Sequence, residues 1–586
     1  MLKRFFISML GSIAGFWISM VIVGLIGFSV IMGLVASALG ENAVVVKDGS
    51  VLYIDLSGDI VERYQPTDPW TMLQQGGTGG EALADILKSI RAAKGDDRIV
   101  GIYINAAGVN IGKAGAEELV DALSDFKQCG KWVIAYGDNY SQTDYLIASQ
   151  ADAVYLNTVG SVDIHGLGVE VPHFKRLLDK LQVEMQVVRV GEFKSAVEPF
   201  ILTEMSDSAR MQLRMVLDSV WNYERFTMAD ARRLKVDSVD SWVDAMIACR
   251  SAQYSVDHKL VDGLMYRRQV EDLLREKCGA NDDEELPLVT PSEYVCTLPT
   301  ADFQKNHVAV LFACGDILDT GEGGIVGETM APEIITLADD DNVKALVLRV
   351  NSGGGSAFAS EQIWEALEYF KSKGKPYYVS MGDYAASGGY YISCGADRIY
   401  ADRSTLTGSI GVFGLIPDLS GLMNNHLGIN FSEVKTNKNG FAISTTRAMT
   451  DTERLAMEAH VNEIYDLFTS RVANCRNIPQ ERVKAIGGGR VWAGGDGLRL
   501  GLVDEIGTLN DAINAIVAKV SLSPDDVVYY PEVEESFMQF LARQASENVK
   551  INGYEVNAGT VQLLQFVDYL RAMSPIQARM CPIELR

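Results

Sequence analysis

The sequence predicts an α/β protein in which two copies of one domain follow a single N-terminal membrane-spanning segment. Three observations support this prediction: a long uncharged stretch near the N-terminus, an order of motifs that occurs twice, and short apolar runs that alternate with amphipathic segments. Such apolar runs are typical of a parallel sheet buried on both faces. We expect a tip at 1–4, an anchor at 5–40, repeats at 45–290 and 300–525, and a helical tail at 526–586.

The composition excludes several classes of protein. Hydrophobic residues make up 47% of the 586 residues and charged residues 22%, which is typical of globular domains and not of disordered chains. The formal net charge is −25, and such an acidic surface repels phosphate backbones, so we expect no nucleic-acid partner. The mean hydropathy of +0.06 argues against a protein with many membrane spans.

The N-terminal stretch 5–40 contains no Asp, Glu, Lys, Arg or His. A transmembrane helix needs roughly 20 apolar residues, so this stretch is long enough to span a bilayer. Lys3 and Arg4 are expected to stay in the cytoplasm, which places the rest of the chain across the membrane. A cleaved signal peptide is the alternative, and Ala-Ser-Ala at 36–38 resembles a cleavage site. The apolar run, however, is longer than the roughly 7–15 residues of a signal peptide, so we favour a retained anchor.

The body of the chain contains the same order of motifs twice. Residues 98–138 and 343–383 each consist of an apolar β-branched run, a Gly-rich turn, an amphipathic helix and a second apolar run, which is a βαβ pattern. Three more pairs of segments follow in the same order, at an offset of 242 to 248 residues: 145–157 with 390–402, 159–168 with 407–416, and 258–264 with 500–507. We therefore predict a duplicated α/β domain, with a linker that begins near 284–287.

The two copies differ at two chemically important positions. Ser387 lies in the Ala-Ala-Ser-Gly-Gly-Tyr segment of the second copy, and Gln142 occupies the aligned position of the first. Lys194 lies in the Gly-Glu-Phe-Lys-Ser-Ala segment of the first copy, and its nearest equivalent in the second is Gly440. One copy thus supplies a serine and the other a lysine. A fused duplicate can divide one active site in this way.

Ser387 has the surroundings of a nucleophile. A serine hydroxyl needs a base within hydrogen-bond reach and donors that stabilise the oxyanion. The predicted helix after Ser387 offers unpaired N–H groups, although serine at this position also caps helices. The N–H groups of Gly354, in a second Gly-rich turn, and of Gly388 are the candidate oxyanion donors.

Lys194 is the candidate base. A lysine is neutral near pH 7 only when it is desolvated, and Lys194 lies among Val and Phe residues. Its neighbours Glu192 and Glu198 would oppose this if they paired with the ammonium, and the sequence does not say where they point. A Ser-His-Asp triad also stays open, although no His lies near either Gly-rich turn.

The sequence gives no indication of a metal or an organic cofactor. The eight cysteines form no Cys-x-x-Cys pair, and the six histidines show no His-Glu-x-x-His spacing. We expect free buried thiols, no metal and no cofactor, and the sequence does not select a disulfide pair.

Five segments of the chain belong together: Gly-Glu-Phe-Lys-Ser-Ala-Val-Glu-Pro-Phe at 191–200, Asn-Ser-Gly-Gly-Gly-Ser at 351–356, Ala-Ala-Ser-Gly-Gly-Tyr-Tyr-Ile-Ser at 385–393, Thr-Gly-Ser-Ile-Gly-Val at 407–412, and Gly-Arg-Val-Trp-Ala-Gly at 489–494. In this order they resemble bacterial signal peptide peptidase A in its long, duplicated form, also called protease IV, of serine peptidase family S49. The resemblance covers about 45–525 and the anchor. One residue departs from the family pattern: Gly353 stands where the family turn commonly has proline, and this loosens the turn.

The resemblance implies a Ser-Lys dyad with Ser387 as nucleophile, Lys194 as general base and Ser409 as the hydroxyl that orients the lysine. It also implies Clp-protease/crotonase-like domains, a homotetramer, and a single-pass protein of the bacterial inner membrane with its body on the periplasmic side. The implied substrates are remnant signal peptides and other hydrophobic peptides, so the partners would be these peptides and the lipid bilayer.

Two other functions compete with this interpretation. A crotonase-like acyl-CoA enzyme also uses Gly-rich turns as oxyanion holes, but it needs a basic patch for CoA. Removing Lys3 and Arg4 from the total leaves −27 on the body of the chain, which argues against such a patch. A catalytically inactive membrane scaffold is the third possibility, and labelling of Ser387 with a serine-reactive probe would distinguish it from a peptidase.

Overall fold

The computed structural model describes residues 46–63, 81–281, 284–299, 302–321, 323–531 and 576–580. The predicted tip and anchor lie outside the described residues, as does most of the predicted tail. Among the described residues, no helix is both long and apolar enough to cross a membrane. The chain forms two compact units, and everything described below belongs to the unit made of 48–63, 80–532 and 554–586.

The first repeat is built on a six-stranded parallel sheet with the strand order β6-β4-β3-β2-β1-β7. Its strands are β1 (Ser50–Asp59), β2 (Ile99–Asn110), β3 (Trp132–Gly137), β4 (Ala153–Leu156), β6 (Gly263–Leu264) and β7 (Leu288–Val289). Its helices are α3 (Leu83–Gly95), α4 (Lys113–Lys127), α5 (Gln142–Ala148), α6 (Lys175–Lys180), α7 (Glu198–Ile201), α8 (Asp207–Ala231), α9 (Val236–Asp244), α10 (Ala252–Asp257), α11 (Arg267–Cys278) and α12 (Pro291–Cys296).

The second repeat has a sheet of the same topology. Its strands β18-β14-β13-β11-β8-β19 are parallel and follow the order of the first sheet, and β15 and β17 extend it from β13. The strands are β8 (His307–Cys314), β11 (Val343–Ser352), β13 (Tyr377–Ala386), β14 (Arg398–Ala401), β15 (Leu406–Gly408), β17 (Val491–Ala493), β18 (Glu505–Ile506) and β19 (Val527–Tyr530). The helices are α13 (Gly327–Asp339), α14 (Ala357–Ser372), α15 (Gly388–Ser393), α16 (Asp451–Arg476), α17 (Gln480–Ile486), α18 (Gly494–Leu500) and α19 (Leu509–Val520). The shared strand order is the structural counterpart of the repeated motifs, although β19 lies past the predicted boundary at 525.

The apolar runs are buried on both faces, as a parallel sheet between helices requires. Along β11, Leu346 and Leu348 point into one hydrophobic cluster with α14 and α16. The alternate residues Ala345 and Val347 point into a second cluster with α19. The alternation follows from the two-residue period of a strand.

A third sheet joins the two repeats. Its order is β10-β9-β12-β20-β16-β5, with β5 (Glu184–Val190), β9 (Ile317–Leu318), β10 (Ile325–Val326), β12 (Gly354–Ser356), β16 (Val412–Asp418) and β20 (Ile576–Arg579). The strand β5 comes from the first repeat and pairs antiparallel with β16 of the second along its whole length. This pairing carries the segment that follows β5, which contains Lys194, to the second repeat. Within the predicted tail 526–586, the described residues form the strands β19 and β20, whereas we expected helix.

A buried ionic network also connects the repeats. Arg349 of β11 is 1% exposed and lies 2.9 Å from Glu62 and 2.7 Å from Glu118, both of the first repeat. The carboxylate of Asp383 on β13 accepts the N–H of Ala114, at the start of α4. Removing one partner from such a buried pair is costly because it leaves an uncompensated charge. The network therefore fixes α4 against the second sheet.

Glu118 makes the stability of this contact depend on pH. Burial raises the pKa of Glu118 to about 7 from its ordinary 4.5, although the charge of Arg349 lowers it. A carboxyl whose pKa is raised in the folded state stabilises the fold when the pH is below its unfolded-state pKa. That stabilisation is lost as the pH rises through about 7. We predict that the stability of Glu118→Gln relative to that of the wild type increases as the pH rises from 5 to 8. The increase should be on the order of 1 kcal/mol or more. Thermal unfolding of both proteins at several pH values measures it, and parallel curves would contradict it.

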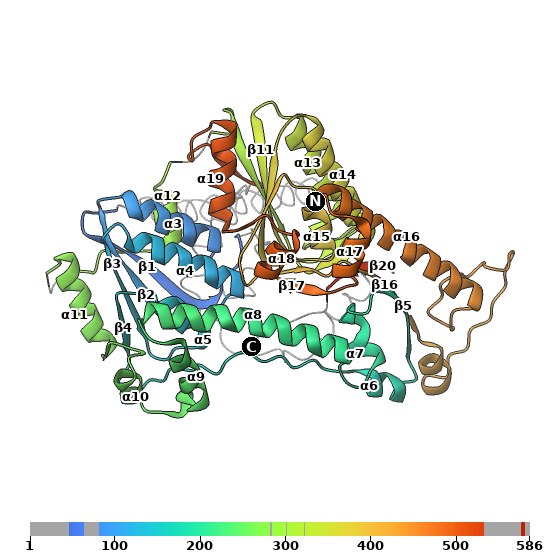
Figure 1. Ribbon diagram of the computed structural model, residues 1–586, viewed down its shortest axis with the longest axis horizontal. Coiled ribbons are helices and arrows are strands. Elements are labelled where there is room, and N and C mark those ends of the chain that lie inside the picture. The colour runs from blue at the N-terminus through green and yellow to red at the C-terminus, as the bar shows by residue number, and fades with distance from the viewer. Residues whose placement is uncertain are drawn as a thin grey trace, which may run out of the picture. The chain divides into compact units, whose positions relative to one another are not determined.

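Helix α8 contacts both repeats and runs alongside them in Figure 1. Near its C-terminal end, Glu224 accepts a hydrogen bond from Gln142 of the first repeat at 2.8 Å. Near its N-terminal end, Gln212 accepts the N–H of Val491 of β17 at 3.2 Å. Ser206 begins the helix by accepting the N–H of Ala209. This helix thus fixes the lysine-bearing segment, which lies just before it in the chain, against β17.

Candidate active site

Ser387 follows β13 directly and precedes α15. Its backbone has φ 56° and ψ −114°, a conformation that costs a residue other than glycine about 1–3 kcal/mol. The N–H of Ser387 donates to Gly408 at 2.8 Å, and its carbonyl accepts the N–H of Tyr391. Its side chain makes no capping hydrogen bond to the helix. Ser387 therefore does not cap the helix with its side chain, and its hydroxyl points to another group.

That other group is the amine of Lys194. The Lys194 Nζ lies 2.7 Å from the Ser387 Oγ, although the two residues are 193 positions apart in the chain. It also lies 3.0 Å from the carbonyl oxygen and 3.2 Å from the Oγ of Ser409. All three residues are at most 1% exposed. Three predicted site residues thus lie together, in a position where a neutral amine could take the serine proton.

The two carboxylates next to Lys194 in the sequence bind elsewhere. The Glu198 carboxylate accepts hydrogen bonds from the Ser206 hydroxyl at 2.8 Å and from the Ser206 N–H at 3.1 Å. The Glu192 carboxylate accepts one from the Ser208 hydroxyl at 2.7 Å. Both partners lie at the start of α8. These hydrogen bonds answer the question that the sequence left open about where the two glutamates point.

Ser409 is held by the loop that precedes β17. Its backbone has φ 49°, its N–H donates to Arg490 at 2.7 Å, and its hydroxyl lies 3.3 Å from the Gly489 carbonyl. This geometry presents both oxygens of Ser409 to the amine of Lys194. The hydroxyl can therefore orient the amine, while the carbonyl keeps a second contact with it.

We predict that Ser409→Ala lowers kcat for peptide hydrolysis about 10- to 100-fold. The change removes one acceptor of the Lys194 amine, but the carbonyl of residue 409 keeps the other, so the loss stays below that of a dyad residue. The matched control is Ser161→Ala in the first repeat, because Ser161 occupies the aligned position and bonds to Asn139 on the surface. Steady-state kinetics measure the effect. Equal rates for the two variants would contradict it.

Two glycines of the quoted motifs, to which the sequence analysis assigned no role, lie against Lys194. A Cβ on Gly489 would lie 2.6 Å from the backbone N and Cα of Lys194, and one on Gly411 would lie 3.3 Å from its Cδ. The neighbouring Gly488 accepts the N–H of Phe193 at 3.0 Å. The close approach of the two backbones requires glycine at 489, where φ is +83°. The signal in the sequence is the run Gly-Gly-Gly at 487–489.

We predict that Gly489→Ala lowers kcat by about 10- to 100-fold through displacement of Lys194. A methyl group at this position needs the lysine backbone to move, and a shift of about 1 Å at a catalytic group can cost about 100-fold. Gly495→Ala is the control, because nothing lies within 4 Å of a Cβ there. Hydrolysis rates of both variants test the prediction, and a fully active Gly489→Ala protein would contradict it.

The predicted oxyanion donors lie side by side. A Cβ on Gly354 would lie 2.7 Å from the N of Gly388, and the φ of Gly354 is +99°, so only glycine fits. The N–H of Gly354, however, donates to the Ser352 Oγ at 3.1 Å. Because this N–H is already bonded to Ser352, the role of Gly354 as an oxyanion donor stays a prediction. The N–H of the adjacent Gly355 is a second candidate. At Gly353, where the family has proline, nothing lies within 4 Å of a Cβ.

The described residues aligned with Ser387 and Lys194 in the opposite copies do not form a second site. The side chain of Gln142, aligned with Ser387, is buried and donates to Glu224 while its oxygen accepts the N–H of Gly166 at 3.0 Å. Gly440, the nearest equivalent of Lys194, is exposed. The position aligned with Ser387 thus holds a buried amide, and the position nearest to Lys194 lies in an exposed loop.

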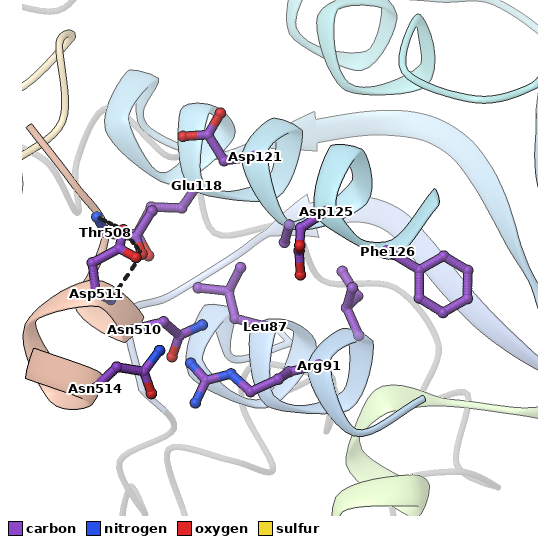
Figure 2. Close-up of a pocket in the computed structure, with 12 residues that line it drawn as sticks. Leu87, Arg91, Glu118, Asp121, Asp125, Phe126, Thr508, Asn510, Asp511 and Asn514 are labelled. Carbon is purple, nitrogen blue, oxygen red and sulfur yellow. Dashed lines mark hydrogen bonds between the residues drawn. The ribbon is translucent and has the colours of Figure 1, made fainter. Parts of the chain in front are cut away.

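A separate cavity of about 360 Å³ lies away from the dyad, between α3, α4 and α19. Figure 2 shows Arg91, Asp121 and Asn514 around it. Neither Ser387 nor Lys194 lines this cavity. Among the described residues, no group of three or more His, Cys, Asp or Glu could hold a metal ion. The described cysteines are free thiols, but we expected them to be buried, and Cys129, Cys249 and Cys296 are exposed.

A family model described as peptidase family S49 matches residues 125–281 and 369–523, once in each repeat. The chain belongs to peptidase family S49. Protease 4 of Haemophilus influenzae is 34% identical over 518 residues, covering 85% of this chain and 83% of that protein. Protease 4 of Salmonella typhi is 36% identical over 518 residues, covering 84% of this chain and 82% of that protein.

A shorter family member is similar to part of the chain. The putative signal peptide peptidase SppA of Enterococcus faecium is 32% identical over 232 residues, covering 39% of this chain and 67% of that protein. Among solved structures, ClpP1 from Listeria monocytogenes matches 34% of this chain and 92% of its own, with 14% identity and a TM-score of 0.23. Membership of family S49 makes the chain a serine peptidase, in place of the acyl-CoA enzyme and the inactive scaffold.

Proposed function

We propose that this serine peptidase uses Ser387 as nucleophile and Lys194 as general base, and that it degrades remnant signal peptides and other hydrophobic peptides from a membrane anchor. The observation that carries the proposal is the buried contact of 2.7 Å between the Lys194 Nζ and the Ser387 Oγ, formed across the two repeats. The substrate class has two supports: the similarity to the putative signal peptide peptidase of Enterococcus faecium, and the uncharged stretch 5–40 that would keep the site near the bilayer.

In the proposed mechanism, the neutral amine of Lys194 takes the proton of the Ser387 hydroxyl while the Oγ attacks the substrate carbonyl. The N–H of Gly388 and that of Gly354 or Gly355 stabilise the oxyanion. The protonated Lys194 then gives its proton to the leaving amine, and an ester to Ser387 remains. A water molecule, activated by the same amine, hydrolyses the ester. Through both steps, the hydroxyl of Ser409 keeps the amine of Lys194 oriented toward the Ser387 Oγ.

A serine-reactive fluorophosphonate tests this mechanism. We expect it to label the wild type at Ser387, as located by mass spectrometry of the digested protein. We also expect the detergent-solubilised enzyme to cleave a synthetic signal peptide, and not a charged, hydrophilic peptide of equal length. Labelling at another serine would overturn the dyad, and equal cleavage of both peptides would overturn the substrate class.

We further propose that the chain forms a homotetramer on the periplasmic side of the inner membrane. The loop between Leu422–His426 and α16, which projects past the end of α16 in Figure 1, exposes apolar side chains. They are Leu427, Ile429, Phe431, Val434, Phe441 and Ile443, and Val434 is 93% exposed. A cluster of this kind on a soluble surface favours contact with another protein chain. Analytical ultracentrifugation in detergent tests the tetramer, and Val434→Asp should weaken it.

A further inference from the structure

A strand from the C-terminal part of the chain lies against the candidate active site. The strand β20 (Ile576–Arg579) lies between β12 and β16 and is antiparallel to both. Its register pairs Arg579 with Gly354 and Ala578 with Gly355. A peptide substrate that adds a strand to a sheet edge would use the same backbone groups. The chain's own tail thus occupies the place of a bound peptide.

The carbonyl group of Ala578 lies between the two predicted oxyanion glycines. Its oxygen is 2.2 Å from the position of a Cβ on Gly354 and 3.1 Å from that of a Cβ on Gly388. The same Gly354 position is 2.7 Å from the N of Gly388. A substrate carbonyl that reacts with Ser387, the residue before Gly388, must bring its oxygen to this place.

Both sides of the bond between Ala578 and Arg579 are anchored. On the N-terminal side, Gln577 and Ile576 pair with Phe413 and Gly414 of β16. On the C-terminal side, the Met580 N–H donates to the Gly353 carbonyl at 2.7 Å.

The side chains beyond this bond are held as well. The Arg579 guanidinium lies 2.8 Å and 2.9 Å from the two carboxylate oxygens of Asp316. The side chain of Met580 is 4% exposed and packs with Ala386 and Leu406. Contacts on both sides of a bond are what an endopeptidase needs in order to hold a peptide for cleavage.

We infer that the enzyme cleaves its own chain between Ala578 and Arg579, a conclusion that rests on the proposed function. The Ser387 Oγ bonds to the Ala578 carbonyl carbon, and its proton passes to Lys194. The C–N bond to Arg579 breaks, and Lys194 gives the proton to the new amino group of residues 579–586. Water then hydrolyses the ester, which leaves a carboxylate on Ala578 and restores Ser387.

The same contacts indicate what the site prefers next to the scissile bond. The side chain of Ala578 is wholly buried, so a larger residue at this position would have to displace its neighbours. We therefore infer a preference for a small residue at the carbonyl side of the cleaved bond. Until it is cut, the tail competes with added peptides because it occupies their place.

Mass spectrometry of the purified full-length protein tests the self-cleavage. We expect the wild type to end at Ala578 and Ser387→Ala to end at Arg586. Arg579→Pro should stay uncut, because the proline ring crowds the scissile nitrogen, whereas the matched control Arg579→Ala keeps an ordinary amide and should be cut. Both variants lose the ion pair to Asp316, so they differ only at the backbone of residue 579, where proline lacks the N–H and restricts the preceding residue. The uncut Arg579→Pro should still hydrolyse an added signal peptide, but more slowly than the wild type, because its tail competes for the site.

The possible outcomes separate the two proposals. A wild type that hydrolyses the added peptide but still ends at Arg586 overturns the self-cleavage and leaves the proposed function standing. A wild type that does neither overturns both. Cleavage of Arg579→Pro at the same bond overturns the assigned register. Mixing Ser387→Ala with the wild type tests whether the reaction is intramolecular: the variant should keep its C-terminus, and trimming at the wild-type rate would overturn cleavage within one chain.

Discussion

Replacing Ser387 by alanine is expected to lower kcat for peptide hydrolysis by about 10⁴-fold or more. The change removes the only atom that forms the ester in the proposed mechanism, and loss of the nucleophile in serine peptidases has effects of this size. The substrate should still bind, because the strands β12 and β16 and the glycine turn are unchanged. We therefore expect a large fall in kcat, together with a raised apparent KM because the uncut tail competes with the substrate for β12 and β16.

Replacing Ser387 by glycine separates chemistry from stability. Both variants lack the hydroxyl and should be equally inactive. The backbone at this position has φ 56°, which strains alanine but not glycine. We expect Ser387→Gly to be more stable than Ser387→Ala by about 1 kcal/mol, measured by denaturant unfolding. Activity in either variant above one per cent of the wild-type rate would contradict the role of Ser387, and equal stabilities would contradict the strain.

The family resemblance implied the dyad because the evidence for it is local to each segment. Ser387 and Lys194 each stand in a short motif, and the repeat showed that each motif lacks its residue in the other copy. The parallel sheets were predictable for the same reason, since apolar runs and their order along the chain define a βαβ unit. The two side chains come within 2.7 Å of each other once the fold brings these two motifs together.

The features that the sequence missed depend on contacts between distant segments. The backbone of Gly489 touches that of Lys194, and nothing in the Gly-Gly-Gly run says which segment approaches it. The directions of Glu192 and Glu198 depend on where α8 begins, which tertiary packing decides. The strand β20 was expected as helix. Four residues that gain their hydrogen bonds from β12 and β16 carry no periodic pattern of their own.

Lys194→Met should lower kcat by about 10³-fold or more while the protein stays folded. Methionine has a similar length and fills the space of the buried aliphatic chain, but it has no group that accepts a proton. The neighbouring hydroxyl of Ser409 is not a substitute base. Stability should not fall much, because the change removes a buried amine that is costly to desolvate and leaves the backbone of the 191–195 segment in place.

Lys194→Arg is the control that distinguishes a base from a positive charge. A guanidinium keeps the charge but stays protonated at every pH at which the protein is folded, so it cannot take the proton of Ser387. We expect both variants to lose hydrolysis and to react slowly with a fluorophosphonate at Ser387. If Lys194→Arg kept more than a tenth of the wild-type rate, the lysine would act through its charge alone. If Lys194→Met kept that rate, another residue would have to be the base, and the division of the site between the two repeats would lose its chemical reason.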